Sequence, residues 1–455
     1  MIHACLSDLA AAFALRVNDA DAEIAGVSTD TRRLQPGNLF VAIKGERVDG
    51  HDFVAAARER GASAALVEHP VAVDLPQLVV RDSQTALGDI ARRWRLCCAA
   101  RVVGITGSNG KTTVKSLTHE ILSRAGTCHT TQGTLNNEIG LPLTLCALPD
   151  DYRYAVIEMG AGKPGDIEYL ANIAHADVAL VNNVAPAHLE RMHSLQGVAV
   201  TKGAIYSVLS DQGIAVVNAE DAFASYFIEL AGTRQIFRFG LIDAAEIRGR
   251  VISGGAVQHI AITTPLGEIE VRLPLTGIHN ARNALAATAL ALAAGAALSH
   301  VQDGLQAASA VSGRLMQHPL ANGARLIDDS YNANPGSVRA AIDTLAGIDG
   351  ERWLVLGDMA ELGADSTALH RDVGAYARAR GIERLCTVGE RSLDTCKGYG
   401  ATAEHFANQA ALIEALRSDL RHGITLLIKG SRSSAMDRVV GALLGAATGG
   451  TQHAA

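Results

Sequence analysis

The amino-acid sequence predicts an α/β protein of three domains: a small α/β N-terminal domain, a central P-loop domain with a doubly wound sheet, and a C-terminal Rossmann-like domain. Three observations support this fold class. The chain has 455 residues, which corresponds to about three domains of roughly 150 residues each. Two stretches alternate apolar strands with helices, a pattern typical of parallel sheets covered on both faces. A glycine-rich loop follows the first strand of the first series.

The first 82 residues form the predicted N-terminal domain. Residues 38–44 (NLFVAIK) alternate as expected for a strand, residues 53–60 fit a helix, and residues 64–68 fit a second short strand. A helix over residues 85–96 is expected to lead from this domain into the next one.

Residues 83–312 form the predicted central domain. Its expected strands are apolar almost throughout, and they cover residues 101–106, 154–159, 177–182 and 213–218. Residues 246–273 contain short β-like runs with glycine-rich turns, which predict a small antiparallel appendage. Residues 280–298 predict one long alanine-rich helix.

Residues 313–455 form the predicted C-terminal domain. Four apolar runs alternate again with helical segments, which indicates a second parallel sheet. The expected strands cover residues 325–329, 353–357, 384–389 and 425–429.

Composition narrows the classes of function. The chain carries 40 Lys and Arg against 47 Asp and Glu, a net charge of −7, so nucleic acid is not an expected partner. Only 8 Phe, 8 Tyr and 2 Trp are present, too few for a protein that stacks on bases. Hydrophobic residues make up 48% and charged residues 19%, as in a folded globular protein.

Membrane insertion and secretion are not expected from the sequence. The longest uncharged apolar run, residues 284–298, has 15 residues and is too short to span a bilayer. The first 15 residues contain Asp8 and no basic residue before an apolar run, so no signal peptide is predicted. The seven cysteines are scattered without a C-x-x-C pair, which predicts reduced thiols and a cytoplasmic location.

The strongest motif is a glycine-rich loop between the strand at 102–106 and a helix at 113–124. Such a loop lets backbone N–H groups converge on a phosphate at a helix N-terminus, where a lysine and a threonine add a cation and a Mg²⁺ ligand. The spacing is shorter than G-x-x-x-x-G-K-[ST], and a glycine-rich turn without a ligand is the alternative. The order of strand, loop and helix favours a mononucleotide-binding domain that binds ATP through Gly107, Ser108, Asn109, Gly110, Lys111, Thr112 and Thr113.

Three further polar residues lie near the ends of the elements that come after the phosphate loop, and each has a functional and a plain structural interpretation. Glu158 ends a buried strand, where a carboxylate would face the ligand crevice and bind Mg²⁺, or would act as a helix cap or loop acid. His188 lies beyond the following strand, as a ligand or as a plain loop histidine. Lys202 is expected to begin a helix, where a lysine is by default solvated.

Five segments together resemble the Mur ligases, the ATP-dependent amide-forming enzymes of peptidoglycan synthesis. They run in order along most of the chain: residues 107–113, 158–160, 187–190, 201–203 and 279–284. The resemblance implies three domains, an acyl-phosphate mechanism, and ATP and Mg²⁺ as cofactors.

Two more segments indicate which family member is closest. Residues 328–335 (DDSYNANP) and 356–363 (LGDMAELG) are similar to the ligase that adds D-alanyl-D-alanine to UDP-N-acetylmuramoyl-tripeptide. Related ligases would show D-Y-A-H-x-P or D-G-A-H-N-P in place of the segment at 328–335. The resemblance therefore implies these two substrates as partners, and we expect a monomer. An earlier Mur ligase step, and a P-loop switch protein that controls a partner, are the alternatives.

The resemblance also implies roles for individual residues. Lys202 would be carbamylated, so that it becomes an anion. The expected Mg²⁺ ligands are Thr112, Glu158, His188 and Lys202, and the expected catalytic residues are Lys111, Lys202, His188 and Arg314. Arg314 would reach the γ-phosphate of ATP and Asp329 its ribose. Asn280 and Asn283 would bracket the adenine, with helix N-capping as the alternative.

The substrate residues implied by the resemblance belong to two domains. The UDP end would bind in the N-terminal domain at Ser28, Lys44, Asp49 and His51. The muramoyl-peptide would bind in the central domain at Thr134, Asn136 and Asn137. Asp358 or Glu361 would assist the loss of the amine proton, and the turn at 429–432 would bind an anion or be an ordinary basic turn.

Overall fold

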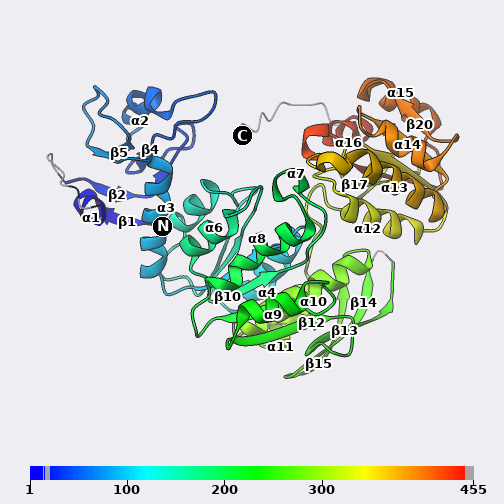
Figure 1. Cartoon of the computed structure of the whole chain (residues 1–455), viewed down its shortest axis with the longest axis horizontal. Helices are drawn as coiled ribbons and strands as arrows, with labels where there is room; N and C mark the ends of the chain where they lie inside the picture. Colours follow the sequence, from blue (N-terminus) through cyan, green and yellow to red (C-terminus); the bar gives the residue numbers. More distant parts are fainter. Residues whose placement is uncertain (14, 16–20, 256, 446–455) are drawn as a thin grey trace.

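The computed structural model describes residues 1–13, 15, 21–255 and 257–445. Figure 1 shows three bodies in chain order: a small N-terminal body, a large central one, and a C-terminal one beside the central body. The last ten residues of the predicted C-terminal domain lie outside the described part. The expected domain boundaries at 82 and 312 fall between elements and stay a prediction.

The N-terminal body holds two small sheets. A two-stranded antiparallel sheet pairs β1 with β2, and a parallel sheet has the order β3-β4-β5-β6. The expected strand at 38–44 is shorter than predicted, because Lys44 leaves the sheet and pairs with Asp49 instead. The elements are β1 His3–Cys5, α1 Leu6–Ala12, β2 Glu23–Ala25, β3 Val27–Ser28, β4 Leu39–Val41, the 3-10 helix η1 Gly50–Phe53, α2 Val54–Glu59, β5 Ala64–Val67 and β6 Gln77–Val79.

The central body is built on a nine-stranded sheet of order β15-β14-β13-β12-β11-β10-β7-β9-β8. Neighbouring strands are parallel along the run β13-β12-β11-β10-β7-β9-β8. The elements are α3 Ser83–Cys97, β7 Arg101–Thr106, α4 Lys111–Ala125, β8 Cys128–Thr130, α5 Gly140–Cys146, β9 Tyr154–Glu158, α6 Asp166–Ala174, β10 Val178–Val181, α7 Leu189–Met192, α8 Leu195–Ser207, β11 Ile214–Asn218, α9 Ala224–Ala231, β12 Gln235–Gly240, β13 Ile247–Ser253, β14 Gln258–Thr264, β15 Gly267–Leu273, α10 Ile278–Ala293 and α11 Leu298–Gln306.

Two predictions for the central body were wrong in detail. The segment at 246–273 is antiparallel as predicted, but it is not an appendage, because β13 pairs with β12 in parallel and continues the main sheet. The long alanine-rich helix ends at Ala293, since Gly295 adopts φ 93°, and Leu298 begins a second helix.

The C-terminal body has a six-stranded sheet of order β16-β17-β21-β18-β19-β20, parallel except for β16. All four predicted strands are present. The elements are β16 Met316–Pro319, β17 Arg325–Asp329, α12 Pro335–Ala346, β18 Glu351–Leu356, η2 Gly363–Asp365, α13 Ser366–Ala379, β19 Arg384–Val388, α14 Leu393–Tyr399, β20 Glu404–Phe406, α15 Gln409–Asp419, β21 Ile424–Lys429, η3 Arg432–Ser434 and α16 Asp437–Leu444.

Helices cover both faces of the central sheet. One buried cluster joins the sheet to α3, α6 and α8, and a second joins it to α4 and α10. This arrangement confirms the predicted doubly wound α/β class and explains why the central strands are apolar on both sides. Among the described residues, no helix combines the length and apolar composition needed to cross a bilayer.

The helix that starts at the phosphate loop, α4, is held in place by its packing on α11. A Cβ added to Gly304 of α11 would lie 2.7 Å from the Ile121 Cα of α4. We therefore expect Gly304→Ala to destabilise the protein by about 1–2 kcal/mol, because overpacking outweighs the gain in helix propensity. Thermal unfolding measures the difference.

The matched control is Gly441→Ala in α16, where no atom lies within 4 Å of the added Cβ. This variant is expected to gain about 0.5–1 kcal/mol. Equal effects of the two substitutions would contradict the packing argument.

Candidate active site

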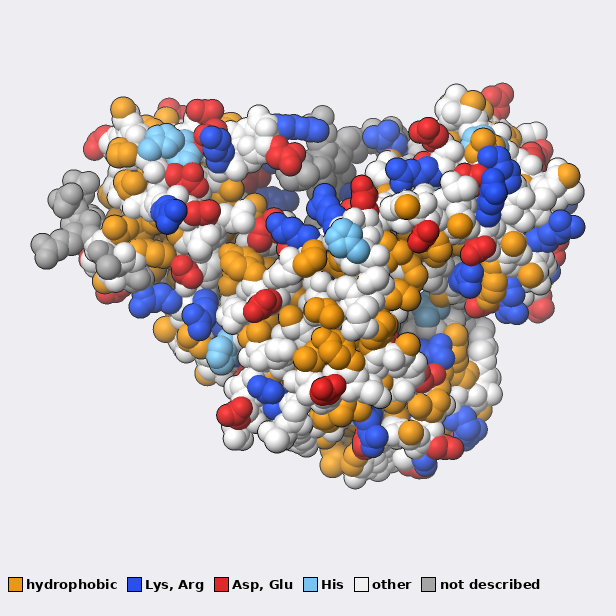
Figure 2. Space-filling view, in the orientation of Figure 1, with side chains coloured by type: hydrophobic (Ala, Val, Ile, Leu, Met, Phe, Trp, Pro, Cys, Tyr) orange, Lys and Arg blue, Asp and Glu red, His pale blue; other side chains and the backbone are white. Residues whose placement is uncertain are grey.

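A cleft of about 650 Å³ opens where the carboxyl edge of the central sheet faces the C-terminal body. It is lined by the phosphate loop, by the ends of β9 and β10, by the start of α10, and by residues 313–341 of the C-terminal body. Figure 2 shows a hollow above the central body, with Lys and Arg side chains near it. Ligands of doubly wound folds bind at this edge, so the cleft is the candidate active site.

The phosphate loop is formed as predicted, with its lysine folded back. Gly110 adopts φ 79° and precedes α4, and a Cβ there would lie 2.5 Å from Asn283 Oδ1. Lys111 Nζ donates to the carbonyl of Gly107 at 2.8 Å. Burial lowers the pKa of Lys111, and the nearby carboxylate of Glu158 opposes that effect. The lysine is thus held at the helix N-terminus, where an anion is favoured.

A chain of asparagines joins α10 to the phosphate loop. Asn182 Nδ2 donates to the Asn109 carbonyl at 3.0 Å and to Asn283 Oδ1 at 3.1 Å. Asn283 Nδ2 donates to Asn280 Oδ1 at 3.1 Å. The N-capping alternative for Asn280 is wrong, because Gly277 precedes the helix and makes no side-chain cap, and Asn280 Nδ2 donates back to a carbonyl. The adenine role of both asparagines stays a prediction.

Glu158 is the last residue of β9, and 3% of it is exposed. The helix-cap and loop-acid alternatives are therefore wrong. Asn136 Nδ2 donates to Oε1 at 2.8 Å, whereas Oε2 is buried and has no hydrogen-bond partner. A buried carboxylate oxygen without a donor is costly, and a bound cation would remove that cost.

The loop before α5 carries three predicted peptide-binding residues. Asn136 and Asn137 line the cleft, whereas the exposed Thr134 does not. Asn137 Oδ1 accepts from the N–H of Gly140 at 2.8 Å and so shapes the start of α5. All three remain predicted substrate residues.

His188 lines the cleft and precedes α7 with φ 54°. Its Nδ1 lies 2.5 Å from Oε2 of Glu361, a residue of the C-terminal body. The loop histidine is therefore held by a carboxylate from another part of the chain, which the sequence did not indicate.

Lys202 is not at the start of a helix, as was expected. It lies inside α8, only 1% of it is exposed, and it makes no ion pair with any described residue. Burial, followed by the charge of Lys111, lowers its pKa well below the usual value. The solvated-lysine alternative is wrong, because the side chain is buried inside a helix.

Four residues were predicted to bind Mg²⁺. Among the described residues, no three His, Cys, Asp or Glu side chains form a metal cluster. Thr112 Oγ1 accepts from Arg314 Nη2 at 3.0 Å. The unpartnered Glu158 Oε2 and the imidazole of His188 face one cleft and suit a divalent cation, while a carbamate on Lys202 would add a further anionic oxygen donor. The residues fit the predicted cation, and the ligand set stays a prediction.

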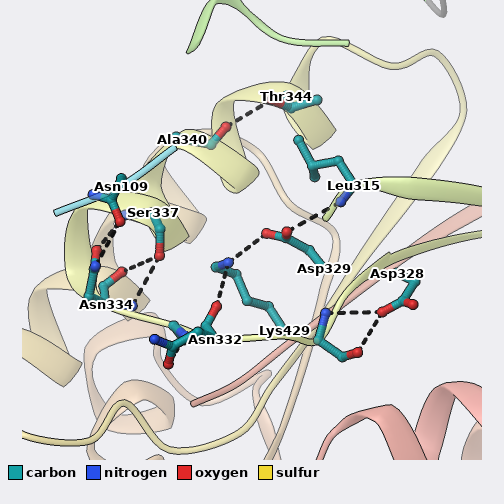
Figure 3. Close-up of polar contacts among 12 residues, drawn as sticks. Asn109, Leu315, Asp328, Asp329, Asn332, Asn334, Ser337, Ala340, Thr344 and Lys429 are labelled. Atoms are coloured by element: carbon teal, nitrogen blue, oxygen red, sulfur yellow. Dashed lines mark hydrogen bonds and ion pairs between the residues drawn. The ribbon is translucent and has the colours of Figure 1, made fainter. Parts of the chain in front are cut away.

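Arg314 connects the C-terminal body to the phosphate loop. Besides its bond to Thr112, its guanidinium lies 4.3 Å from the centroid of the Tyr331 ring. Asn334 makes a second link, since its Nδ2 donates to Asn109 Oδ1 at 2.8 Å (Figure 3). Both contacts bring polar groups of the C-terminal body against the phosphate loop, and the predicted γ-phosphate role of Arg314 stays a prediction.

Asp329 and Lys429 form a buried ion pair on the cleft wall, 2.6 Å apart (Figure 3). The other oxygen of Asp329 accepts from the N–H of Leu315 at 3.3 Å, and Lys429 also donates to the Asn332 carbonyl at 2.8 Å. Both carboxylate oxygens are engaged here, so the ribose role of Asp329 stays a prediction. Asp329 compensates the charge of Lys429, and this weakens the interpretation of the turn at 429–432 as an anion-binding site.

The predicted UDP-binding residues lie outside the cleft, in the N-terminal body. His51 contacts Asp49 Oδ1 through Nδ1 at 2.6 Å, and its Nε2 accepts from the N–H of Glu68 at 2.9 Å. Ser28 donates to the Asp30 carbonyl, and Lys44 pairs with Asp49 through the backbone. These contacts stiffen the loops, and a role in binding UDP stays a prediction.

Sequence reasoning missed His279, although it stood in the quoted segment 279–284. It lines the cleft, and its Nδ1 is buried without a hydrogen-bond partner. Burial, helped by the charges of Lys429 and Arg282, lowers its pKa to about 4. Lys163 and Arg191, which also line the cleft, carried no motif signal.

Three family models match the chain in order. They are the Mur ligase family, catalytic domain, over residues 23–95; the Mur ligase middle domain over 105–291; and the Mur ligase, glutamate ligase domain, over 313–432. A UDP-N-acetylmuramoyl-tripeptide–D-alanyl-D-alanine ligase of Escherichia coli K12 is 46% identical over 97% of this chain and 99% of its own length.

Solved structures agree with these matches. MurF from Acinetobacter baumannii superimposes with a TM-score of 0.88 at 35% identity, covering 93% of this chain and 94% of its own. MurF ligase from Thermotoga maritima, in complex with ADP, gives a TM-score of 0.83 at 26% identity, covering 92% and 97%.

The lowered pKa of His279 makes stability depend on pH. Its pKa is about 4 in the folded protein and 6.5 when exposed, so the unfolded state binds more protons as pH falls. The contribution of His279 to the free energy of unfolding is fully present above about pH 6.5 and is lost as pH falls toward 4. Between pH 7 and pH 5 the loss amounts to about 2 kcal/mol. Urea unfolding at the two pH values should show this extra loss in wild type and not in His279→Gln.

The exposed His422 provides a control. His422→Gln should keep the wild-type loss between the two pH values. An identical loss in His279→Gln would contradict the assignment of a neutral buried imidazole.

Proposed function

We propose that this chain, which belongs to the Mur ligase family, joins D-alanyl-D-alanine to UDP-N-acetylmuramoyl-tripeptide in peptidoglycan precursor synthesis and converts ATP to ADP and phosphate. One observation carries the proposal. A phosphate loop and an arginine from two different bodies meet in one cleft, Arg314 against Thr112, in a chain 46% identical to the Escherichia coli enzyme of that name. ATP use is further supported by the related structure that holds ADP.

The reaction needs ATP because a carboxylate is a poor acyl donor. The tripeptide carboxylate takes the γ-phosphoryl group, ADP leaves, and an acyl phosphate forms. The amine of D-alanyl-D-alanine then attacks the acyl carbon, phosphate leaves, and the nitrogen loses a proton. Negative charge concentrates on the transferred phosphoryl group, so its neutralisation is the main task of the site.

Lys111 and Arg314 are the cations that this task requires. Lys111 now donates to the Gly107 carbonyl, a bond that it would exchange for phosphate oxygens. Arg314 reaches the phosphate loop from the opposite wall and is held against Tyr331. A cation on each wall supports phosphoryl transfer between them.

Thr112, Glu158, His188 and a carbamylated Lys202 would hold Mg²⁺. The bound cation would neutralise phosphate oxygens in the cleft. Lys202 supports this proposal because its side chain is buried and burial lowers its pKa, which favours the neutral amine. A neutral amine nitrogen can bond to the carbon of CO₂ and release a proton, which leaves an anionic carbamate.

The substrates would be divided among the three domains at 1–82, 83–312 and 313–455. The first would hold the UDP end through Ser28, Lys44, Asp49 and His51. The second would hold ATP and the peptide, and the third would close over both. We also propose a monomer in the cytoplasm; the seven cysteines are free thiols, which supports a reducing compartment.

Phosphate release should be fast only when both UDP-N-acetylmuramoyl-tripeptide and D-alanyl-D-alanine are present with ATP. L-Alanyl-L-alanine should be poor, because its methyl groups point the other way. Lys111→Ala should lower kcat by about 100-fold or more, since a preorganised cation at the phosphate is lost. A phosphate-release assay over a panel of peptides measures this.

Lys397→Ala, an exposed lysine paired with Asp394, is the matched control and should be fully active. Faster turnover with UDP-N-acetylmuramoyl-dipeptide and a free diamino acid would show an earlier ligase step instead.

Carbamylation of Lys202 has its own test. In ¹³CO₂-equilibrated protein, a carbamate carbon signal should be present in wild type and absent in Lys202→Met, which fills the same buried space. We expect Lys202→Met to bind ATP but to lose roughly 100-fold in activity with Mg²⁺. This role would be excluded if the carbamate signal persisted in Lys202→Met. It would also be excluded if the wild-type protein were active but showed no carbamate signal.

A further inference from the structure

Two cleft residues from different domains contact each other: His188 of the central domain and Glu361 of the C-terminal domain, whose Nδ1 and Oε2 atoms lie 2.5 Å apart. We propose that Glu361 is a positioning residue, which sets the tautomer and orientation of His188 for metal binding. This inference rests on the proposed function, because it assigns a partner to one of the metal ligands proposed above.

The backbone on both sides of the contact is unusual. His188 adopts φ 54° and Glu361 φ 59°, and neither is glycine. Such left-handed conformations are disfavoured for L-residues and persist only where the surroundings hold them, most often at functional sites. Both side chains are brought to the same point by strained turns, which indicates that their meeting is a specific feature of the closed cleft.

Neighbouring contacts hold Glu361 against the central domain. The N–H of Glu190 in α7 donates to the Glu361 carbonyl at 3.4 Å. A Cβ added to Gly363 would lie 3.4 Å from the Glu190 Cα, so η2 and α7 are in close contact. The place of Glu361 is therefore fixed by the way the two domains meet.

The contact has a direct chemical consequence for the histidine. An imidazole that donates its Nδ1 proton to a carboxylate keeps the lone pair on Nε2, the form that binds a metal. Glu361 approaches Nδ1, and Nε2 takes no part in this contact. Glu158 Oε2, which lacks a partner, lines the same cleft. Glu361 would thus orient His188 as one metal ligand, while Glu158 at the end of β9 would be another.

Stability alone does not account for this pair. The side chains of His188 and Glu361 are 31% and 50% exposed, and an exposed ion pair contributes little to folding. Orientation of the ring is the effect that remains. Because the carboxylate comes from the C-terminal domain, the metal-binding form of His188 is selected only when that domain lies against α7. Metal binding and domain closure are then one event.

The test uses the full chain with Mn²⁺ in place of Mg²⁺ and a non-hydrolysable ATP analogue. Electron spin echo measurements detect a ¹⁴N coupling when an imidazole binds Mn²⁺. Wild type should show the coupling, and His188→Gln should lose it. Glu361→Gly, which tolerates φ 59°, should weaken the coupling and raise the Mn²⁺ Kd by about 10–100-fold.

Two further variants separate orientation from general damage. Glu361→Gln keeps an oxygen that accepts from Nδ1, so its Mn²⁺ Kd should stay within a few-fold of wild type. Glu190→Gln alters a carboxylate on α7 that makes no ion pair with any described residue, and should match wild type.

Three outcomes would overturn the inference. If Glu361→Gly keeps both the nitrogen coupling and the wild-type Kd, Glu361 does not position His188, and the proposed ligase function is untouched. If it loses turnover but keeps Mn²⁺ binding unchanged, Glu361 acts on the amine proton instead. If wild type shows no coupling, or His188→Gln retains it, His188 does not bind the metal, and the set of metal ligands proposed above is wrong as well. The proposed ligase reaction is tested separately, by the phosphate-release assay.

Discussion

Burial of charge at the carboxyl edge of the central sheet is the constraint on which the rest of the site depends. Glu158 is buried there and Lys111 is half-buried, and a buried charge without a partner is costly. Asn136 satisfies one oxygen of Glu158, and the Gly107 carbonyl satisfies Lys111. What is left is an acidic oxygen without a partner beside a folded-back lysine, so the edge is prepared for a cation and an anion together.

The second organising feature is that the cleft is built from two domains. Arg314 contacts Thr112, Asn334 contacts Asn109, and Glu361 contacts His188, so three separate points of the C-terminal domain touch groups around the phosphate loop. The groups that surround the phosphate loop are therefore supplied by both domains, and the cleft is complete only where the two domains meet.

Local sequence patterns determine many of the individual elements. The strand at 101–106 and the C-terminal strand at 325–329 follow from apolar runs and lie as predicted, and the glycine loop follows its strand as predicted, although the helix after it begins at Lys111 and not at Thr113. Errors arose where a boundary depended on distant contacts: Lys202 lies within α8, and residues 246–273 extend the main sheet through β12. Periodicity shows that an element exists, but its neighbours set its ends.

By itself, then, the sequence determined the three-domain α/β class, the phosphate loop and the set of polar residues that follow the central strands. These features are encoded locally, because strand burial and glycine-lysine spacing involve residues close together in the chain. Only the tertiary structure decided which polar groups are free and which are engaged. It neutralised Lys429 with Asp329, left Glu158 Oε2 and His279 Nδ1 without partners, and brought Glu361 to His188 across 173 positions of the sequence. Such pairings depend on how separate domains pack, which no local pattern records.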